Sequence, residues 1–232
     1  MSGDRTIQVY IDGFNLYRRA LVDTPYKWLD IAALAQLMLP AFEVTRVKYF
    51  TALVKSSAHD NYVRQRQERY LEAIRCDSLV EVHLGYFRRD PVSMPKHPWT
   101  YDEYGKPETV KVKHTREKGS DVNLATHLVW DALHQASSAY AVLTNDSDLV
   151  TPIRMLRELR EVEVGVLFPS EITAKDLRDC GSWSRHIHKS ALARSQLPNP
   201  VTDDHGNEIW RPIEWPGKKR DPGFLRGPDP DT

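Results

Sequence analysis

The sequence predicts an α/β fold of three layers, in which helices cover both faces of a parallel central sheet. Short apolar segments rich in β-branched residues alternate with longer segments of helical period, a pattern typical of such a sheet. Two parts depart from the alternation: a polar stretch at 88–118 and the chain from Pro198 onward, where proline, glycine and charge increase. We therefore expect a domain over 1–190, with 88–118 as a β-ribbon excursion, and an extended, partly docked C-terminal tail over 191–232.

The first half of the chain predicts three strands and three helices. The opening strand, TIQVYI at 6–11, is apolar and β-branched and stops at Asp12-Gly13. Asp30 has the side chain of a helix N-cap, and Pro40 ends the helix that follows it. The remaining elements are a helix at 15–21, a helix at 30–39, a strand at 44–54, a helix at 59–75 and a strand at 79–87.

The second half begins with the excursion, which we expect to turn at Tyr104-Gly105. Apolar residues then recur at helical spacing from Ser120 to Ala136 and predict an amphipathic helix. The elements expected after it are a strand at 140–143, a helix at 149–160, a strand at 163–168 and a short helix near 175–177. Trp210 and Trp215 in the tail indicate that part of it packs on the domain.

Composition excludes several classes of protein. Hydrophobic residues make up 41% of the 232 residues, enough for a sizeable core, so disorder throughout is excluded. The 32 Lys+Arg balance 32 Asp+Glu, which excludes a strongly basic protein that coats nucleic acid. Two distant cysteines, Cys76 and Cys180, exclude a disulfide framework and a cysteine zinc site. No apolar run approaches the ~18 residues of a membrane span, and no apolar signal stretch precedes Asp12, so we expect a cytoplasmic protein.

Four aspartates stand where a ligand would bind in such a fold. Asp12 follows the first predicted strand, Asp146 and Asp148 follow the strand at 140–143, and Asp121 lies in the first turn of the helix before it. Ligands of open α/β sheets bind outside the carboxyl ends of strands, near a switch in strand order. If the strands at 6–11 and 140–143 are neighbours, these carboxylates face one crevice.

Clustered carboxylates repel one another unless a cation neutralises them. Ligands that are all oxygen favour a hard cation, Mg²⁺ or Mn²⁺. Such a metal activates water and stabilises charge on a phosphoryl oxygen, so hydrolysis of a phosphodiester is the natural use. The sequence has no GxxxxGK[ST], GxSxG or HExxH motif, which argues against a P-loop, a serine hydrolase and a zincin.

Each aspartate also has a structural explanation. Asp12 before Gly13 could form a tight turn, and Asp148 could cap the helix at 149–160. Asp121 in a first helical turn gains from the helix dipole without any metal. The joint pattern, rather than any single aspartate, favours a site.

Polar neighbours of the aspartates are candidate substrate-binding residues. The Asn15 amide could bind a phosphate or hold Asp12, and capping explains it equally well. Lys118, with Gly119 and Ser120, could meet a phosphate, although a solvated loop lysine is the commoner case. Thr144 and Asn145 could orient water or substrate, or simply close the turn.

Three segments resemble a known family: VYIDGFNLY at 9–17, KGSDVNLATHLV at 118–129 and AVLTNDSDLVTPIRML at 141–156. They are similar to the NYN domain of PIN-like nucleases and look like its bacterial LabA-like branch. The similarity runs from about residue 6 to 180, and SQLP and RPIEW in the tail fit the same branch more weakly. The segment TND at 144–146 departs from the usual SGD, so the small glycine is missing.

The resemblance implies a Rossmann-like sheet of the PIN type and metal-dependent cleavage of RNA. By motif matching, Asp12, Asp121 and Asp146 fall on the acidic metal-site positions, and Asp148 falls on a fourth, more variable acidic position. Asn15 matches the asparagine that follows the first acidic residue. Because the acidic set is complete, a degenerate member is disfavoured.

Charge is distributed unevenly along the chain. Residues 46–118 hold 15 Lys+Arg against 10 Asp+Glu, interleaved with aromatic residues. Cations mixed with aromatic rings suit single-stranded RNA, because they combine phosphate attraction with base stacking. We expect the excursion, with Arg88 and Arg89 at its base, to guide RNA toward the metal; a solvated decorative loop is the alternative.

The leading prediction is a Mg²⁺- or Mn²⁺-dependent endoribonuclease, with Asp12, Asp121 and Asp146 holding the metal and Asp148 assisting catalysis. A non-catalytic regulator that binds RNA or protein is the alternative. A haloacid dehalogenase-type phosphatase would have an aspartate in place of Phe14, and a TOPRIM domain a glutamate in place of Asp12. A second copy of the chain or a regulatory protein is a further possible partner, and no membrane is expected to be one.

Overall fold

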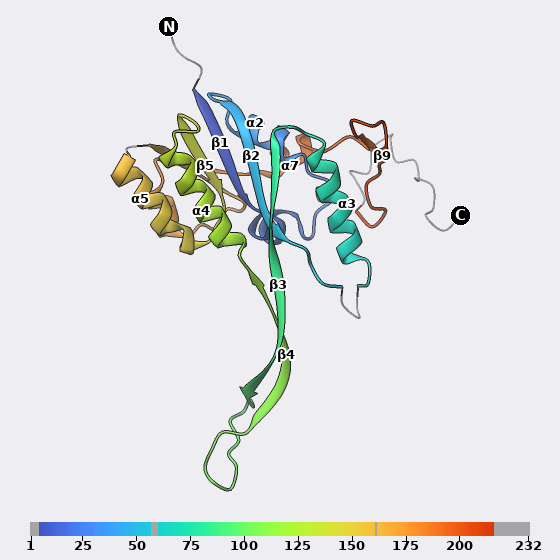
Figure 1. Ribbon diagram of the computed structural model, residues 1–232, viewed down its shortest axis with the longest axis vertical. Helices are drawn as coiled ribbons and strands as arrows, with labels where there is room; N and C mark the ends of the chain where they lie inside the picture. Colours follow the sequence, from blue (N-terminus) through green and yellow to red (C-terminus); the bar gives the residue numbers. More distant parts are fainter. Residues whose placement is uncertain (1–4, 57–59, 161, 216–232) are drawn as a thin grey trace, which may run out of the picture.

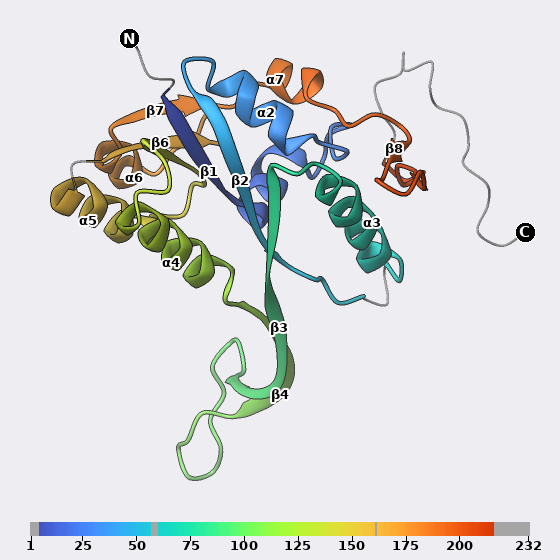
Figure 2. The same ribbon diagram turned by 45° about the horizontal axis from the view of Figure 1, so that its top comes forward.

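The computed structural model describes residues 5–56, 60–160 and 162–215, and within this part the chain forms one large mixed α/β sheet covered on both faces (Figures 1 and 2). The strand order is β4-β3-β2-β1-β5-β6-β7. All neighbours are parallel except β3 and β4, which pair antiparallel. The strands are β1 (Thr6–Asp12), β2 (Glu43–Ala52), β3 (Val80–Pro95), β4 (Thr109–Lys118), β5 (Ala139–Leu143), β6 (Glu163–Phe168) and β7 (Trp183–His186).

Helices flank both faces of this sheet. The face covered by α4, α5 and α6 and the face covered by α1, α2 and α7 have separate apolar cores. The helical segments are α1 (Gly13–Leu16), the π-helical η1 (Tyr17–Leu21), α2 (Ile31–Met38), α3 (Val63–Arg75), α4 (Ser120–Leu133), the 3₁₀ turn η2 (Ser147–Leu149), α5 (Val150–Arg160), α6 (Lys175–Cys180) and α7 (Lys189–Arg194). None of the described helices is long and apolar enough to cross a membrane.

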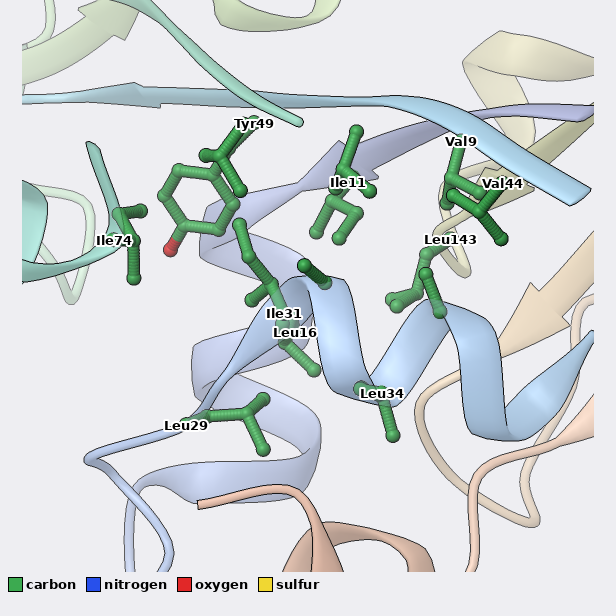
Figure 3. Close-up of a cluster of buried hydrophobic side chains, with 14 of the residues drawn as sticks. Val9, Ile11, Leu16, Leu29, Ile31, Leu34, Val44, Tyr49, Ile74 and Leu143 are labelled. Carbon is green, nitrogen blue, oxygen red and sulfur yellow. The ribbon is translucent and has the colours of Figure 1, made fainter. Parts of the chain in front are cut away.

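Successive side chains of β1 point into two different apolar cores, one on each face of the sheet. Val9 and Ile11 point into the core between the sheet and α2. There they lie with Leu143 of β5 and with Ile31 and Leu34 of α2 (Figure 3). Tyr10, between them, points into the opposite core with Val142. Successive strand residues face opposite sides, so a central strand between two helical layers needs the continuous apolar run that the sequence has.

The predicted fold class is confirmed, and the main strands and helices lie where the sequence predicts them. Several elements differ, and α7 and the two short strands that follow it were not predicted. The strand expected at 79–87 continues to Pro95, because β3 leaves the body of the sheet and pairs with β4 alone. Strand β7 was not predicted, since its four residues have no apolar run. The helix expected at 59–75 begins at Val63 as described; His59 lies outside the described residues.

The excursion forms a long antiparallel ribbon that projects from the body of the domain (Figure 1). Its turn lies close to the predicted position: the Gly105 amide donates to the Asp102 carbonyl, and Gly105 has φ +74°. Side chains alternate between the two sides of a ribbon. Near the body, Phe87, Arg89 and Glu117 share one side, whereas Arg88 and Lys118 lie on the other.

The C-terminal part packs on the domain up to Trp215. The Trp28 indole donates a hydrogen bond to the Pro198 carbonyl at 2.9 Å, and the rings of Tyr70 and Trp215 lie 6.1 Å apart between centroids. The short strands β8 (Val201–Thr202) and β9 (Glu208–Ile209) add Val201 and Ile209 to the core. The predicted division at residue 190 falls inside α7 and stays a prediction; the rest of the tail, 216–232, lies outside the described residues.

Candidate functional site

The site lies where the order of the strands reverses. Strand β1 pairs with β2 on one side and with β5 on the other, so successive crossovers leave β1 in opposite directions. Asp12 is the last residue of β1, and Asp146 follows β5 by three residues. Open α/β sheets bind ligands at this switch point, outside the carboxyl ends of the strands.

Asp12 is buried and held on both carboxylate oxygens. Its Oδ1 accepts a hydrogen bond from the Asn15 amide at 2.9 Å, which caps α1, and its Oδ2 accepts one from the Thr144 hydroxyl at 3.0 Å. Burial raises the pKa of this carboxyl, although both hydrogen bonds act in the opposite direction. The side chain is therefore fixed in position at a site that disfavours its own charge.

Thr144 also positions Asp146. The Asp146 amide donates to the Thr144 hydroxyl at 3.0 Å, and Asp146 Oδ1 accepts from the Asp148 amide at 3.0 Å, which caps η2. One hydroxyl thus bridges the two strand ends. Because Thr144 is fully buried, that geometry is protected from water.

Asp121 reaches the same place from the first turn of α4. Gly119 precedes the helix with φ +100°, a conformation that L side chains rarely adopt, and so turns the chain from β4 into α4. Burial, and to a lesser extent the nearby charges of Asp12, Asp146 and Glu117, together raise the pKa of Asp121 to about 6. The site therefore disfavours the charged form of this carboxyl when no cation is present.

These carboxylates line a single open pocket, which we call the carboxylate pocket. It encloses about 730 Å³ of empty space, including its open mouth. Carboxylates, two arginines, an amide and an aromatic ring border it: Asp12, Phe14, Asn15, Arg18, Arg19, Glu117, Ser120, Asp121 and Asp146. The pocket thus combines an acidic floor with cations beside it.

The donor set suits a hard divalent cation. Every acidic group in the carboxylate pocket offers oxygen ligands, which Mg²⁺ and Mn²⁺ prefer. In the described part of the chain, however, no three His, Cys, Asp or Glu side chains are already drawn together around one ion position.

The predicted site residues separate into two groups. Asp12, Asn15, Asp121 and Asp146 line the carboxylate pocket. Asp148 is exposed and does not line it, although its amide donates to Asp146.

Thr144 and Asn145 are buried behind the carboxylate pocket rather than in its wall. The Asn145 side chain donates to the Ile172 carbonyl at 3.0 Å and accepts from the Ala174 amide at 2.8 Å. Its position, where glycine is usual, therefore ties β5 to the loop before α6. Asn15 Oδ1 accepts from the Asn145 amide at 3.1 Å, which orients Asn15 beside Asp12.

The predicted basic residues of the ribbon do not all face the same way. Phe87 packs edge-on against Phe14 with ring centroids 5.7 Å apart, and Glu117 lines the carboxylate pocket. Arg89 lies on the side of the ribbon that carries these two residues. Arg88 and Lys118 instead line a separate hollow on the other side, with Asp90 and Arg116.

Four residues of the carboxylate pocket escaped the sequence analysis: Phe14, Arg18, Arg19 and Glu117. A signal for the arginines exists, because Arg18 and Arg19 stand four residues after Phe14 and Asn15, which places each pair on one helical face. Arg18 indeed lies 5.8 Å from the Phe14 ring centroid. Glu117 stands two residues before the Gly119 turn, in a polar strand whose pattern marks no single residue.

Comparison with known proteins gives the family. The NYN domain model matches residues 6–184. The chain belongs to the NYN domain family. NYN domains are part of the PIN-like superfamily and are generally nucleases, so the family predicted from the three motifs is confirmed.

Two individual proteins add to this result. The chain is 31% identical to 6-hydroxy-3-succinoylpyridine 3-monooxygenase of Pseudomonas putida in an alignment 226 residues long. The match covers 84% of this chain and 70% of that protein. A crystal structure of a Vibrio parahaemolyticus protein of unknown function matches with a TM-score of 0.51 at 16% identity, over 82% of this chain and 96% of that one. The structural match supports the fold alone.

Proposed function

We propose that this NYN protein is a metal-dependent endoribonuclease that hydrolyses phosphodiester bonds in single-stranded RNA. One observation carries the proposal: Asp12, Asp121 and Asp146 line one open pocket at the strand-order switch point, together with Glu117. Four carboxylates around one pocket repel anionic substrates unless a cation neutralises them. The family, generally of nucleases, supports the same reading.

Mg²⁺ or Mn²⁺ is the proposed cofactor. Asp12, Asp121 and Asp146 would hold it, with Glu117 close by and Asp148 assisting from η2. When bound, the metal supplies an activated water and stabilises negative charge on the phosphoryl oxygens. The chain's own part is to hold the carboxylates in place, which the bonds from Asn15 and Thr144 do for Asp12.

Cations next to the carboxylates would orient the substrate phosphate. Arg18 and Arg19 are exposed side chains of η1 that line the pocket, and a guanidinium can hold two phosphate oxygens at once. Asn15 has its amide oxygen engaged with Asn145, so its NH₂ group is oriented to donate to a phosphate. Water would attack phosphorus and the bond to the 3′ oxygen would break, leaving a 5′-phosphate and a 3′-hydroxyl.

The test is cleavage of end-labelled single-stranded RNA by the full chain in Mn²⁺, Mg²⁺ or EDTA, with analysis of the new ends. The proposal expects cutting in Mn²⁺ or Mg²⁺, none in EDTA, and products with 5′-phosphates. Cutting that persists in EDTA would contradict a metal mechanism. If the chain neither cuts RNA nor binds Mn²⁺, the non-catalytic regulator that binds RNA or protein replaces the nuclease.

One observation favours a second candidate, an oxygenase. The Pseudomonas relative covers most of this chain and is named for hydroxylation of a succinoylpyridine. Oxygen consumption that depends on 6-hydroxy-3-succinoylpyridine and on an added reductant, measured on the same preparation, distinguishes the two candidates. Turnover there without metal-dependent RNA cleavage would favour the oxygenase.

A further inference from the structure

A second pocket, lined by aromatic rings, adjoins the carboxylate pocket; we call it the ring pocket. It holds about 590 Å³ of empty space including its open mouth. Phe14 lines both pockets, and Gly13, which follows Asp12 in the chain, lines the ring pocket. The other aromatic walls are Tyr17, Tyr49, Tyr70 and Trp215.

The ring pocket is assembled from parts of the chain that are far apart in sequence. Tyr49 comes from β2, Tyr70 from α3 and Trp215 from the docked C-terminal part. The ring centroids of Tyr49 and Tyr70 lie 6.4 Å apart, and those of Tyr70 and Trp215 lie 6.1 Å apart. Flat rings on several sides favour a flat, aromatic occupant.

One polar group of the pocket wall is free to bind a ligand. The Tyr49 hydroxyl forms no hydrogen bond within the described part of the chain, and it is not among the fully buried polar atoms, so it is open to the pocket. The other polar groups of the wall are engaged: Tyr70 donates to the Leu29 carbonyl at 2.9 Å, and Gln67 bonds to the backbone of Ala52 and Val54. The Tyr49 hydroxyl is therefore available to hydrogen-bond a polar atom of a ligand in the pocket.

A cation lies at the same pocket. Lys27 lines it, with its Nζ 5.9 Å from the Tyr17 ring centroid, and forms no ion pair with a carboxylate of the described residues. Apolar rings, one hydrogen-bonding hydroxyl and one cation together suit an aromatic heterocycle attached to an anionic group. An aliphatic side chain would leave both the hydroxyl and the lysine unused.

We propose that the ring pocket binds one nucleobase of the RNA strand, next to the phosphate at the carboxylate pocket. The inference rests on the proposed ribonuclease function and names a base-binding subsite for it. The base stacks among the aromatic rings, the Tyr49 hydroxyl hydrogen-bonds a polar atom on its edge, and Lys27 contacts a flanking phosphate. The subsite would favour some cleavage positions over others.

The first measurement is binding of the four nucleoside 5′-monophosphates to the full chain in EDTA, by calorimetry. Ribose 5-phosphate, which has the same anion without a base, is the control ligand. We expect at least one nucleotide to bind ten times more tightly than ribose 5-phosphate. Equal affinities for the nucleotides and for ribose 5-phosphate would overturn the proposal. Binding of nicotinate, an aromatic carboxylate that is not a nucleobase, without binding of any nucleotide would overturn it too.

Two variants place that binding in the ring pocket. Tyr49→Phe removes only the hydroxyl, and we expect about a tenfold loss of nucleotide affinity. Val63→Phe enlarges a side chain of the pocket wall and is expected to abolish nucleotide binding. Val122→Phe, the same substitution at an exposed position of α4, is the matched control. Unchanged nucleotide affinity in both Tyr49→Phe and Val63→Phe would refute the subsite.

Mn²⁺ binding and RNA cleavage separate this proposal from the function on which it rests. We expect Val63→Phe to bind Mn²⁺ as the wild type does and to cut RNA with an altered choice of positions. A wild type that cuts RNA, with a pattern unchanged in Val63→Phe, would overturn the subsite and leave the nuclease standing. A wild type that binds nucleotides in this pocket but never cuts RNA would instead overturn the nuclease.

Discussion

The Thr144 hydroxyl donates a hydrogen bond to the buried Asp12 Oδ2 at 3.0 Å. The same hydroxyl accepts from the Asp146 amide, so it joins the ends of β1 and β5 at the switch point. The Asp12 carboxylate cannot shift without breaking this link, which also holds the backbone of Asp146. The relative placement of the two aspartates therefore rests on a buried contact between the ends of β1 and β5.

Replacing Thr144 by valine tests that link. The substitution keeps the shape and removes the hydroxyl, which leaves Asp12 short of a partner in a buried site. We expect a loss of about 1–3 kcal/mol in the free energy of unfolding and weaker Mn²⁺ binding. Chemical denaturation and calorimetry measure both, and Thr144→Ser, which keeps the hydroxyl, should stay close to the wild type. Equal Mn²⁺ affinity in wild type and Thr144→Val would argue against the link.

Asp121→Asn should stabilise the metal-free protein. The pKa of Asp121 is raised to about 6 by burial and by its acidic neighbours, so its charge opposes folding at neutral pH. Allowing for its partial exposure, removal of the charge is worth about 1 kcal/mol, or roughly 2–4 °C in Tm. Mn²⁺ should raise the Tm of the wild type and not that of the variant. A lower Tm for Asp121→Asn in EDTA would show that no repulsion exists.

Two neighbouring histidines predict a pH dependence of stability. His83 and His127 lie with ring centroids 4.1 Å apart, and burial lowers the pKa of each. Their neighbours Lys48, Glu81 and Asp131 act in both directions. Below about pH 6.5 the unfolded chain binds more protons at these two histidines than the folded chain does. Their contribution to stability is therefore present above about pH 6.5 and is lost as the pH falls below it. The Tm of His127→Gln should therefore fall less than that of the wild type between pH 7.5 and 5.5; parallel curves would exclude the effect.

A buried ion pair beneath α4 supports the sheet without taking part in the site. Asp131 Oδ2 accepts from Lys48 Nζ at 2.6 Å and from the Tyr10 hydroxyl at 2.5 Å. Removing Asp131 leaves the buried Lys48 charge without this partner. Asp131→Ala should therefore lower the free energy of unfolding by about 3–5 kcal/mol. The double variant Lys48→Met/Asp131→Leu should recover most of that loss, and Mn²⁺ affinity should stay unchanged. A double variant as unstable as Asp131→Ala would contradict this account.

The two sides of the ribbon predict different effects of the same charge reversal. Arg89 shares a side with Phe87 and Glu117, which reach the carboxylate pocket, whereas Arg88 lies on the opposite side. If the ribbon guides RNA, Arg89→Glu should weaken RNA binding by about tenfold and flatten its salt dependence. Arg88→Glu, the matched control, should have a smaller effect. Equal affinities for both variants and the wild type would remove the ribbon from RNA binding.

Sequence patterns predicted the parts of this site that depend on chain-local signals. Asp12 and Asp146 each follow an apolar strand, and their positions follow from strand order once β1 and β5 are neighbours. Glu117 could not be found in this way, because it lies in a polar ribbon without apolar periodicity. Asn145 was predicted to bind substrate but is buried. Its hydrogen-bond partners, the backbones of Ile172 and Ala174, are distant in sequence, so no local pattern indicates them.

The ring pocket shows the same limit. The sequence marks Tyr49 and Tyr70 only as aromatic residues among the cations of 46–118, and Trp215 only as a residue that docks the tail. The folded chain brings the three together beside Phe14.

The most direct test of the central claim compares two aspartate variants in one RNA cleavage assay with Mn²⁺. Asp146→Asn removes a charge from the carboxylate pocket, and Asp204→Asn makes the same change at an exposed position in the turn between β8 and β9. The account predicts that Asp146→Asn loses about 10²-fold or more of the cleavage rate while keeping its Tm, and that Asp204→Asn cuts as the wild type does. Full cleavage by a folded Asp146→Asn would contradict it.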